Sequence, residues 1–365
     1  MKQKNAPLNV ALVGCGNIVQ TSHSPALLKL ESEGVVNVVA VLEPAAEAQN
    51  NALKVFPKAI VVKSFDELKG LQVDFAIVGS PTHLHAEHSI KLLESGIDVL
   101  CEKPMARTVA EAESMINAAE ANRRLLAVGL LGRFSPVAFS INDYLSRNAF
   151  GNCKNVTMRR GSRNRGPMHG NWRYQKDLAG GGVLVDVGVH MIDLMISWFG
   201  EPVKVLSYQD DRSLNGIEAN CVLKLEFSSD VIAELKLSRD FKMPWHCQVR
   251  CENGLIEHDG DGEELKVRYY SSESNCPVDG SRAETKVMLI PESGDPKVSK
   301  VKSDLFLHQL ENFCAAVLGK CDPLVPGREG IKRCICRITV YIFNLLLGIV
   351  CGTVWRRVIG MFNHC

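Results

Sequence analysis

The chain has 365 residues and a formal net charge of +1, and 46% of its residues are hydrophobic and 23% charged. A chain of this length favours two domains, and the ordinary composition excludes disordered and fibrous proteins. Because the net charge is close to zero and the basic residues are scattered, a nucleic-acid partner is not expected.

The thirteen cysteines include no C-x-x-C pair, so we expect reduced, mostly structural thiols and no metal site. Residues 1–7 lead directly into an apolar run and lack the apolar core of a secretory signal. We therefore expect a cytoplasmic protein.

The first predicted strand, residues 10–13, is a continuous apolar run, as expected for a strand buried on both faces of a parallel sheet. It enters a glycine turn, and a predicted helix follows. This order is typical of a dinucleotide site, because glycines let the backbone approach a pyrophosphate and the helix N-terminus donates N–H groups to it. Val19 replaces the third glycine of the fingerprint, which weakens the motif. The predicted cofactor contacts in this turn are Gly14, Gly16, Asn17 and Ile18.

A second apolar strand, residues 35–42, ends at Glu43. A carboxylate at this position would accept hydrogen bonds from the ribose hydroxyls of the adenosine and would repel a 2′-phosphate. No Lys or Arg lies in the next few positions, so NAD is favoured over NADP. The alternative is an ordinary acidic residue that stabilises the N-terminus of the next helix.

A third buried strand, residues 73–79, leads to Ser80 and Pro81, which we expect to be the N-cap and the first residue of a helix. Residues 97–100 form the next strand. Such alternation predicts a parallel sheet covered by helices, with ligands at the carboxyl ends of its strands. Ser80, Pro81 and His85 lie at such an end and are predicted to contact the cofactor, although a lone histidine there is also compatible with a structural role.

The last strand of this half delivers Glu102, Lys103 and Pro104 to the same edge of the sheet. Pro104 restricts the backbone of its neighbour, so Lys103 is expected to be held firmly. A lysine in this place can donate a hydrogen bond to a substrate hydroxyl and favour its alkoxide, while Glu102 can pair with Lys103 or with the cofactor ribose. The alternative is a simple surface turn.

From about Gly151 the pattern changes to alternating strands at residues 156–160, 221–227 and 231–237. This pattern predicts an antiparallel sheet with one covered face and leaves the other face as a candidate subunit interface. A basic loop, residues 163–170, precedes Trp172 and is either a solvated loop or a lid over the substrate.

Three glycines, residues 180–182, precede a long apolar helix and predict a loop whose backbone passes close to another group. In this helix Asp186, His190 and Asp193 follow at i, i+4 and i+7 and are expected to share one face. Burying such groups unpaired is strongly unfavourable. They are therefore either paired core groups or an acid/base set that faces a pocket.

The C-terminal part begins with residues 303–318, which predict an amphipathic helix, and ends with an atypical apolar tail, residues 331–365. Within the tail, residues 338–355 carry no charge and are just long enough to cross a bilayer. Three alternatives stay open: a helix buried in the fold or at a subunit contact, a reading-frame artefact, and a membrane anchor, which is the least favoured.

Together, these motifs resemble those of the glucose-fructose oxidoreductase / inositol dehydrogenase / MocA family, from about residue 8 to about residue 330. The resemblance is carried by Gly14-Cys15-Gly16, Ser80 to His85, Glu102-Lys103-Pro104, Arg133-Phe134, Trp172-Arg173 and Gly180 to Asp193. It implies an α/β protein with an N-terminal Rossmann domain, residues 1–130, and a C-terminal α/β domain, residues 131–330. The second domain would carry an open, mainly antiparallel sheet that forms the contacts of a homo-oligomer.

The activity implied by the resemblance is hydride transfer between NAD(P) and a hydroxyl or carbonyl group of a sugar, cyclitol or sugar derivative. Lys103 matches the active-site lysine of the family, Asp186 and His190 match its polar pair, and the predicted substrate contacts also include Arg133, Trp172 and Arg173. In this interpretation His190 is the base because of its ordinary pKa, Lys103 stabilises the oxyanion, and the cofactor carries the hydride.

Two other functional classes remain open. A nucleotide-sensing regulator on the same scaffold could dispense with Lys103 and His190, and this sequence retains both. A hydrolase or lyase that uses bound NAD transiently would release no NADH during turnover, which distinguishes it from a dehydrogenase.

Overall fold

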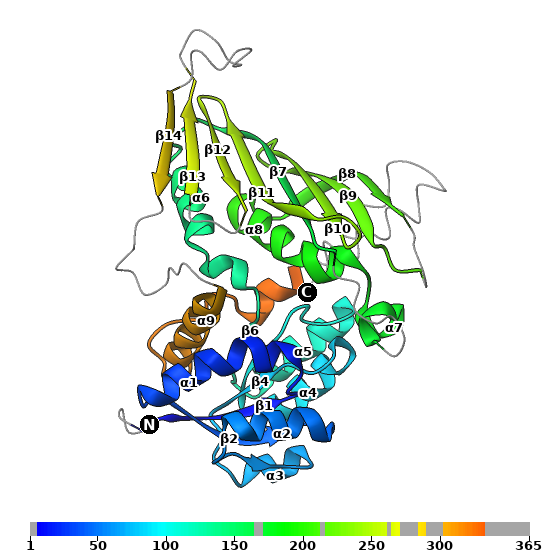
Figure 1. The fold of residues 1–365 in the computed structure, drawn as a ribbon, viewed down its shortest axis with the longest axis vertical. Helices are drawn as coiled ribbons and strands as arrows, with labels where there is room; N and C mark the ends of the chain where they lie inside the picture. The colour runs from blue at the N-terminus through cyan, green and yellow to red at the C-terminus, as the bar shows by residue number, and fades with distance from the viewer. Residues whose placement is uncertain are drawn as a thin grey trace.

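The computed structural model describes residues 6–163, 171–211, 216–260, 264–270, 284–289 and 302–332. Figure 1 shows two domains stacked along the long axis, with the first part of the chain at one end and a broad sheet at the other. Helices α6 (Pro136–Ser146) and α8 (Val189–Phe199) lie between this sheet and the first domain.

The first domain is built on a parallel sheet of six strands in the order β3-β2-β1-β4-β5-β6. The strands are β1 (Leu8–Val13), β2 (Val36–Leu42), β3 (Ile60–Val61), β4 (Phe75–Val78), β5 (Asp98–Cys101) and β6 (Leu126–Val128). The helices are α1 (Ser24–Ser32), α2 (Ala46–Val55), α3 (Phe65–Lys69), α4 (Thr82–Glu94) and α5 (Val109–Ala121). The predicted Rossmann architecture is confirmed, and the four predicted strands are β1, β2, β4 and β5.

Helix α4 begins one residue later than predicted. Pro81 has an extended backbone and is itself the N-cap, and no side chain caps the helix. The Ser80 hydroxyl lies 3.1 Å from Nδ1 of His88 instead, so the predicted capping role of Ser80 is wrong.

The second domain contains a sheet of eight strands in the order β14-β13-β12-β11-β7-β10-β9-β8. These are β7 (Cys153–Gly161), β8 (Pro202–Asp210), β9 (Asn220–Phe227), β10 (Ile232–Ser238), β11 (Met243–Cys251), β12 (Gly254–Asp259), β13 (Glu264–Tyr269) and β14 (Glu284–Leu289). Strands β7 and β10 pair in parallel, and the other neighbouring pairs are antiparallel. The expected open, mainly antiparallel sheet is thus confirmed.

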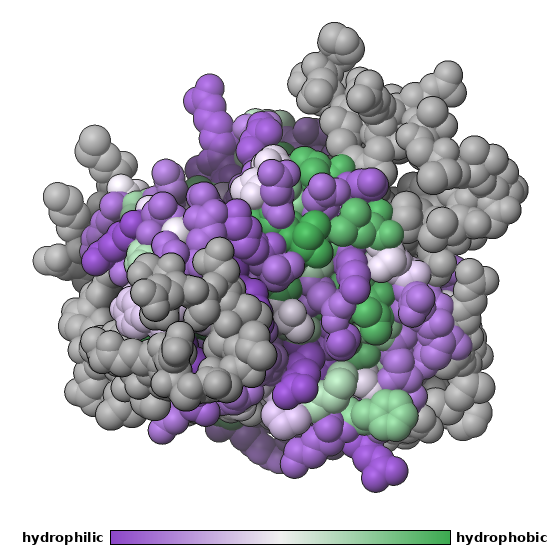
Figure 2. Space-filling model, turned by 90° about the horizontal axis from the view of Figure 1, so that it is seen from above, coloured by the Kyte–Doolittle hydropathy of each residue, from purple (hydrophilic) through white to green (hydrophobic). Residues whose placement is uncertain are grey.

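The two faces of this sheet differ in their side chains. Buried residues alternate with half-buried ones along β9, and the buried set packs with residues of α8 such as Met195 in one apolar cluster. The opposite face carries charged groups, including Lys224 and Glu234, whose ion-pair atoms lie 2.9 Å apart. Figure 2 views the molecule from this end and shows hydrophobic residues gathered in the middle, among hydrophilic ones.

The chain returns to the first domain after the second sheet. The predicted amphipathic helix is α9 (Lys302–Val317), whose residues Phe306, Leu310 and Phe313 share a buried cluster with Leu27 of α1. Helix α9 therefore packs on the first domain, although it lies within residues 131–330.

One helical stretch of the described ranges, Lys176–Phe199, is long and apolar enough to cross a membrane, and 61% of its apolar window is buried inside the protein. Burial on most sides is the ordinary state of a core helix. The predicted apolar segment 338–355 lies outside the described residues.

Candidate active site

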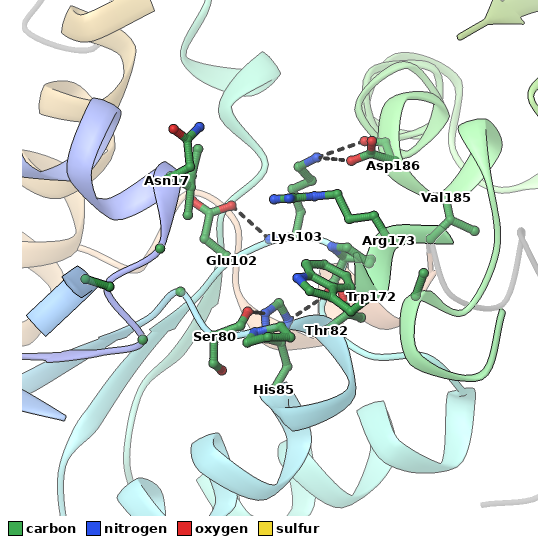
Figure 3. A pocket seen from close by; sticks show the side chains of 18 of the residues that line it. Asn17, Ser80, Thr82, His85, Glu102, Lys103, Trp172, Arg173, Val185 and Asp186 are labelled. Atoms are coloured by element: carbon green, nitrogen blue, oxygen red, sulfur yellow. Dashed lines mark hydrogen bonds and ion pairs between the residues drawn. The ribbon is translucent and has the colours of Figure 1, made fainter. Parts of the chain in front are cut away.

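A cavity of about 340 Å³ lies between the two domains, at the carboxyl ends of β1, β2, β4 and β5. All ten residues predicted to contact the cofactor line it, and the second domain contributes Trp172, Arg173 and Asp186. Figure 3 shows the side chains of both domains around this space. Its other lining residues include Ala45, Thr82, Pro104, Gly181, Val185 and Arg239.

The glycine turn is packed tightly against the end of β4. Gly14 has a φ of +83°, and a Cβ atom there would lie 2.5 Å from the backbone nitrogen of Ser80. A Cβ atom on Gly79 would lie 2.6 Å from Cγ2 of Val19, so the small Gly79 compensates for the valine at the third glycine position. At Gly16 no atom lies within 4 Å of an added Cβ. The turn thus presents bare backbone to the cavity, which fits the pyrophosphate of a dinucleotide.

Glu43 lies at the end of β2, beside the glycine turn. Its Oε2 accepts a hydrogen bond from the backbone N–H of Cys15 at 2.6 Å, and its Oε1 accepts one from Ala45 at 2.8 Å. The carboxylate is therefore fixed next to the turn, at the position where a Rossmann site meets the adenosine ribose. The Glu43 carboxylate and the glycine turn together fit an NAD(P) dinucleotide.

Glu102 is held by a partner from outside its own motif. Its Oε1 lies 2.8 Å from Nε2 of the buried His23, and its Oε2 accepts the backbone N–H of Lys103 at 3.1 Å. Burial alone would raise the pKa of Glu102, but the hydrogen bond with His23 and the charge of Lys103 outweigh it and lower this pKa. Of the two partners predicted for Glu102, Lys103 contributes its backbone N–H, and the structure shows no ion pair between the two described side chains.

The side chain of Lys103 instead crosses to the second domain (Figure 3). Its Nζ donates to the backbone oxygen of Asp186 at 2.8 Å and to Oδ1 of the same residue at 3.0 Å. The other carboxylate oxygen, Oδ2, accepts from Arg239 at 3.0 Å. The charge of Lys103, together with that of Arg239, holds the pKa of Asp186 well below its usual range despite burial. Asp186 is therefore an ionised carboxylate shared by two cations.

The glycine-rich loop explains how Asp186 reaches this position. A Cβ atom on Gly182 would lie 2.1 Å from the backbone oxygen of Glu218, and the buried Glu218 carboxylate accepts the N–H groups of Gly182 and Leu184. This carboxylate satisfies the first donors of the helix. The close approach expected of the glycines is thus confirmed, and the group approached is Glu218.

The helix itself begins with a π turn, Leu184–Gly188, before α8. Spacing of i, i+4 and i+7 predicts a shared face only in a regular α-helix. Asp186 pairs with Lys103 and Arg239, whereas Asp193 is fully buried and pairs with Arg133, with Nη2 and Oδ1 3.0 Å apart. The expectation of one polar set on one face is therefore wrong for Asp193.

His190 differs from the expected base. It is not among the cavity-lining residues of the described structure, and burial, helped by the charge of Lys103, lowers its pKa to about 3. Its imidazole is therefore neutral near pH 7, and the argument from its ordinary pKa fails. The contribution of Lys103 to this shift places the two groups in one electrostatic neighbourhood.

His85 connects the two first-domain segments that line the cavity. Its Nδ1 lies 2.9 Å from the carbonyl oxygen of Pro104 and its Nε2 lies 2.8 Å from that of Ser80. Both ring nitrogens face backbone, and burial lowers the pKa of this histidine. His85 lines the cavity and at the same time braces the ends of β4 and β5.

The three residues predicted from the resemblance to line the substrate pocket separate into two groups. Arg133 does not line the cavity in the described structure, because it pairs with Asp193 and with Glu329, whose Oε2 is 3.2 Å away. Trp172 and Arg173 do line it, and the guanidinium of Arg173 lies 4.8 Å from the centre of the indole ring. Apart from Arg163, the predicted lid 163–170 lies outside the described residues.

Sequence reasoning did not find Arg239, Glu218 or His23. Arg239 directly follows β10, so the strand end was a usable signal. Glu218 and His23 carry no local signal, because each acts on a segment distant in sequence.

The arrangement can hold an oxygen atom of a small polar molecule and exchange a proton with it. An ammonium has three N–H groups, and Lys103 uses two of them on Asp186. No residue that the structure describes accepts the third, which can point at a ligand in the cavity that the glycine turn also lines.

Comparison with known proteins agrees with this geometry. Residues 8–130 match the oxidoreductase family with an NAD-binding Rossmann fold, GFO_IDH_MocA, and residues 140–257 match the GFO/IDH/MocA C-terminal domain. The chain is 29% identical over 199 residues to D-glucoside 3-dehydrogenase of Escherichia coli, which is 54% of this chain and 56% of that protein. It is 30% identical over 233 residues to trans-1,2-dihydrobenzene-1,2-diol dehydrogenase of Danio rerio, covering 63% of this chain and 67% of the relative.

The chain thus spans little more than half the length of the E. coli relative. Among solved structures, levoglucosan dehydrogenase in complex with NADH and levoglucosan is similar with a TM-score of 0.78. The match covers 92% of this chain and 96% of that chain at 18% identity, so it supports the fold alone.

Proposed function

The chain belongs to the GFO/IDH/MocA family of NAD-binding oxidoreductases, and we propose that it is a dehydrogenase acting on a CH–OH group. The proposed substrate is a sugar, a cyclitol or a related polyhydroxylated compound, and the proposed cofactor is NAD. The relatives named above whose sequences match are dehydrogenases of a glucoside and of a dihydrodiol, which supports this substrate class.

The observation that carries the proposal is the contact between Lys103 and Asp186. It joins the nucleotide-binding domain to the second domain inside the cavity that the glycine turn lines. A regulator that only senses the nucleotide has no need of an ammonium aimed across this cavity. Hydride transfer from a carbinol does need a lysine in this place, because the hydroxyl proton must leave as the hydride leaves and the amine form of the lysine can accept it.

In the proposed reaction the substrate loses a hydride and a proton and becomes a carbonyl compound. The bound NAD supplies the hydride acceptor. The amine form of Lys103 takes the hydroxyl proton, and in the reverse direction its ammonium donates a proton to the carbonyl oxygen. Asp186 stays ionised and fixes the position of Lys103. The neutral His190 is not among the described residues that line the cavity, and it takes no part in the proposed proton transfer.

The proposed preference for NAD over NADP rests on Glu43. Its carboxylate, fixed by the N–H groups of Cys15 and Ala45, would accept hydrogen bonds from ribose hydroxyls. A 2′-phosphate in the same place would meet a negative charge instead.

The proposal is tested by incubating purified protein and NAD with a panel of aldoses, glycosides and cyclitols. NADH fluorescence and the carbonyl product are followed together. NADH that accumulates in a one-to-one ratio with the carbonyl product supports a dehydrogenase. Product formation without free NADH would instead identify a hydrolase or lyase with transient redox, and tight NAD binding without any turnover would identify a sensor.

We also propose that the outer face of the eight-stranded sheet binds a second copy of the chain. Its support is the mixture of hydrophobic and hydrophilic residues seen in Figure 2 and the presence of Lys224, Glu234 and Lys236 on the neighbouring strands β9 and β10. Light scattering after size-exclusion chromatography would find at least a dimer. A Glu234→Lys variant would shift the equilibrium toward the monomer, because it places three like charges together.

A further inference from the structure

We propose that Arg239 is a positioning residue for Lys103 and acts through Asp186. The inference rests on the proposed function, since it assigns Arg239 a part in the proton transfer. Arg239 belongs to the second domain, directly follows β10 and lines the cavity.

Arg239 is fixed from several sides. Its backbone N–H donates to the carbonyl oxygen of Ala219 at 2.8 Å, which ties it to the adjoining strand β9. Its guanidinium lies 5.8 Å from the centre of the Tyr174 ring, and only 11% of its side chain is exposed. A guanidinium held in this way loses little further freedom when it binds a carboxylate.

The carboxylate of Asp186 is divided between its two cations. Oδ2 accepts from Arg239 and Oδ1 accepts from Lys103, each at 3.0 Å. Without Arg239, the carboxylate could turn and offer both oxygens to Lys103. The ammonium would then spend its third N–H on Asp186, and this is the N–H that the proposed reaction directs at the substrate oxygen.

Arg239 also sets the charge that Lys103 meets. Among the described residues, the groups that interact with Lys103 are Asp186 from the π turn, Glu102 from the end of β5 and His190 from α8. Arg239 acts on Asp186, Arg160 of β7 acts on His190, and Arg173 lines the same cavity. When the guanidinium is removed, Lys103 no longer shares the Asp186 carboxylate with a second cation. An unshared carboxylate stabilises the ammonium more than the amine that accepts the substrate proton, because the whole charge of the carboxylate then faces Lys103.

The test compares Arg239→Gln, Arg239→Lys and the unchanged protein, with Arg147→Gln as a matched control. Arg147 forms an exposed ion pair with Asp143 at 2.8 Å at the end of helix α6. For Arg239→Gln we expect kcat of alcohol oxidation to fall by between about tenfold and a hundredfold, as for a misplaced catalytic group. The pH of half-maximal kcat should rise by about 1 unit. Arg239→Lys should restore part of kcat and bring the pH of half-maximal kcat most of the way back to that of the unchanged protein. The Kd for NADH should be the same in all of these proteins.

A second readout does not depend on turnover. The rate of acetylation of Lys103 by acetic anhydride, followed by peptide mass spectrometry across pH, reports directly when its amine becomes free. The acetylation curve of Arg239→Gln should lie at higher pH than that of the unchanged protein. Identical curves, or a lowered kcat with an unchanged pH profile, would overturn the inference and leave Arg239 a purely structural residue. If the unchanged protein produced no NADH while the acetylation curve still moved, the proposed function would fail and the coupling of Arg239 to Lys103 would stand.

Discussion

Replacement of Glu43 by alanine should reverse the coenzyme preference. The carboxylate accepts N–H groups from Cys15 and Ala45 at 2.6 and 2.8 Å, so it is held where ribose hydroxyls would replace or join these donors. A hydrogen bond to a charged group contributes about 1.5–3 kcal/mol. Loss of one such bond corresponds to a rise in the Kd for NADH of between about tenfold and 150-fold.

The same substitution should not weaken the binding of NADPH, because the Glu43 carboxylate repels the 2′-phosphate and does not bind it. The ratio of the two dissociation constants should therefore change by a factor of at least about ten. Fluorescence titration of NADH and NADPH measures both constants on one sample. Glu47→Ala is the matched control, since Glu47 is an exposed carboxylate in the first turn of the adjoining helix α2.

The outcome that would refute this reasoning is an equal change for both coenzymes. If Glu43→Ala weakened NADH and NADPH by the same factor, the carboxylate would support the glycine turn without distinguishing the ribose. If neither constant changed, the dinucleotide would bind elsewhere.

Three further predictions concern the second domain. Gly182→Ala should lower the free energy of unfolding by about 2–4 kcal/mol, because its Cβ would lie 2.1 Å from the backbone oxygen of Glu218. Thermal denaturation measures this change. The control Gly70→Ala, where the nearest atom is 4.0 Å away, should change the free energy of unfolding little. His190→Asn should leave the shape of the pH–rate profile above pH 5 unaltered, since the imidazole, with its pKa lowered to about 3, is neutral there; loss of a titration near pH 6.5 would contradict this. Asp186→Asn should reduce kcat about a hundredfold with an unchanged Kd for NADH, and a kcat close to that of the unchanged protein would contradict the role of the ion pair.

Most strands of the first domain could be predicted because each has a local pattern in the sequence. Strands β4 and β5 are buried along their whole length, so each is a short apolar run that ends in a turn. Strands β3 and β6, with two and three residues, are too short to carry such a pattern. The cofactor residues followed from the same logic, because the carboxyl ends of parallel strands meet at one edge.

The second-domain half of the site was predictable only in part. The separation of Asp193 from Asp186 was missed because the helix begins with a π turn, and no periodicity in the sequence marks this turn. The ordinary pKa of histidine was a poor guide to His190, since burial and the nearby Lys103 act on it only in the folded chain. Arg239 and Glu218 were missed because their partners lie far away in sequence.

The most direct test of the proposed chemistry is kcat of Lys103→Met with saturating NAD and an accepted substrate. Loss of a positioned group that accepts the hydroxyl proton lowers kcat by about 10²–10⁴. Lys91→Met, which removes an exposed lysine paired with Glu87 on α4, should retain full activity. A Lys103→Met protein whose kcat stays within about threefold of that of the unchanged protein would contradict the assignment of Lys103 to proton transfer, because loss of a positioned base lowers kcat far more.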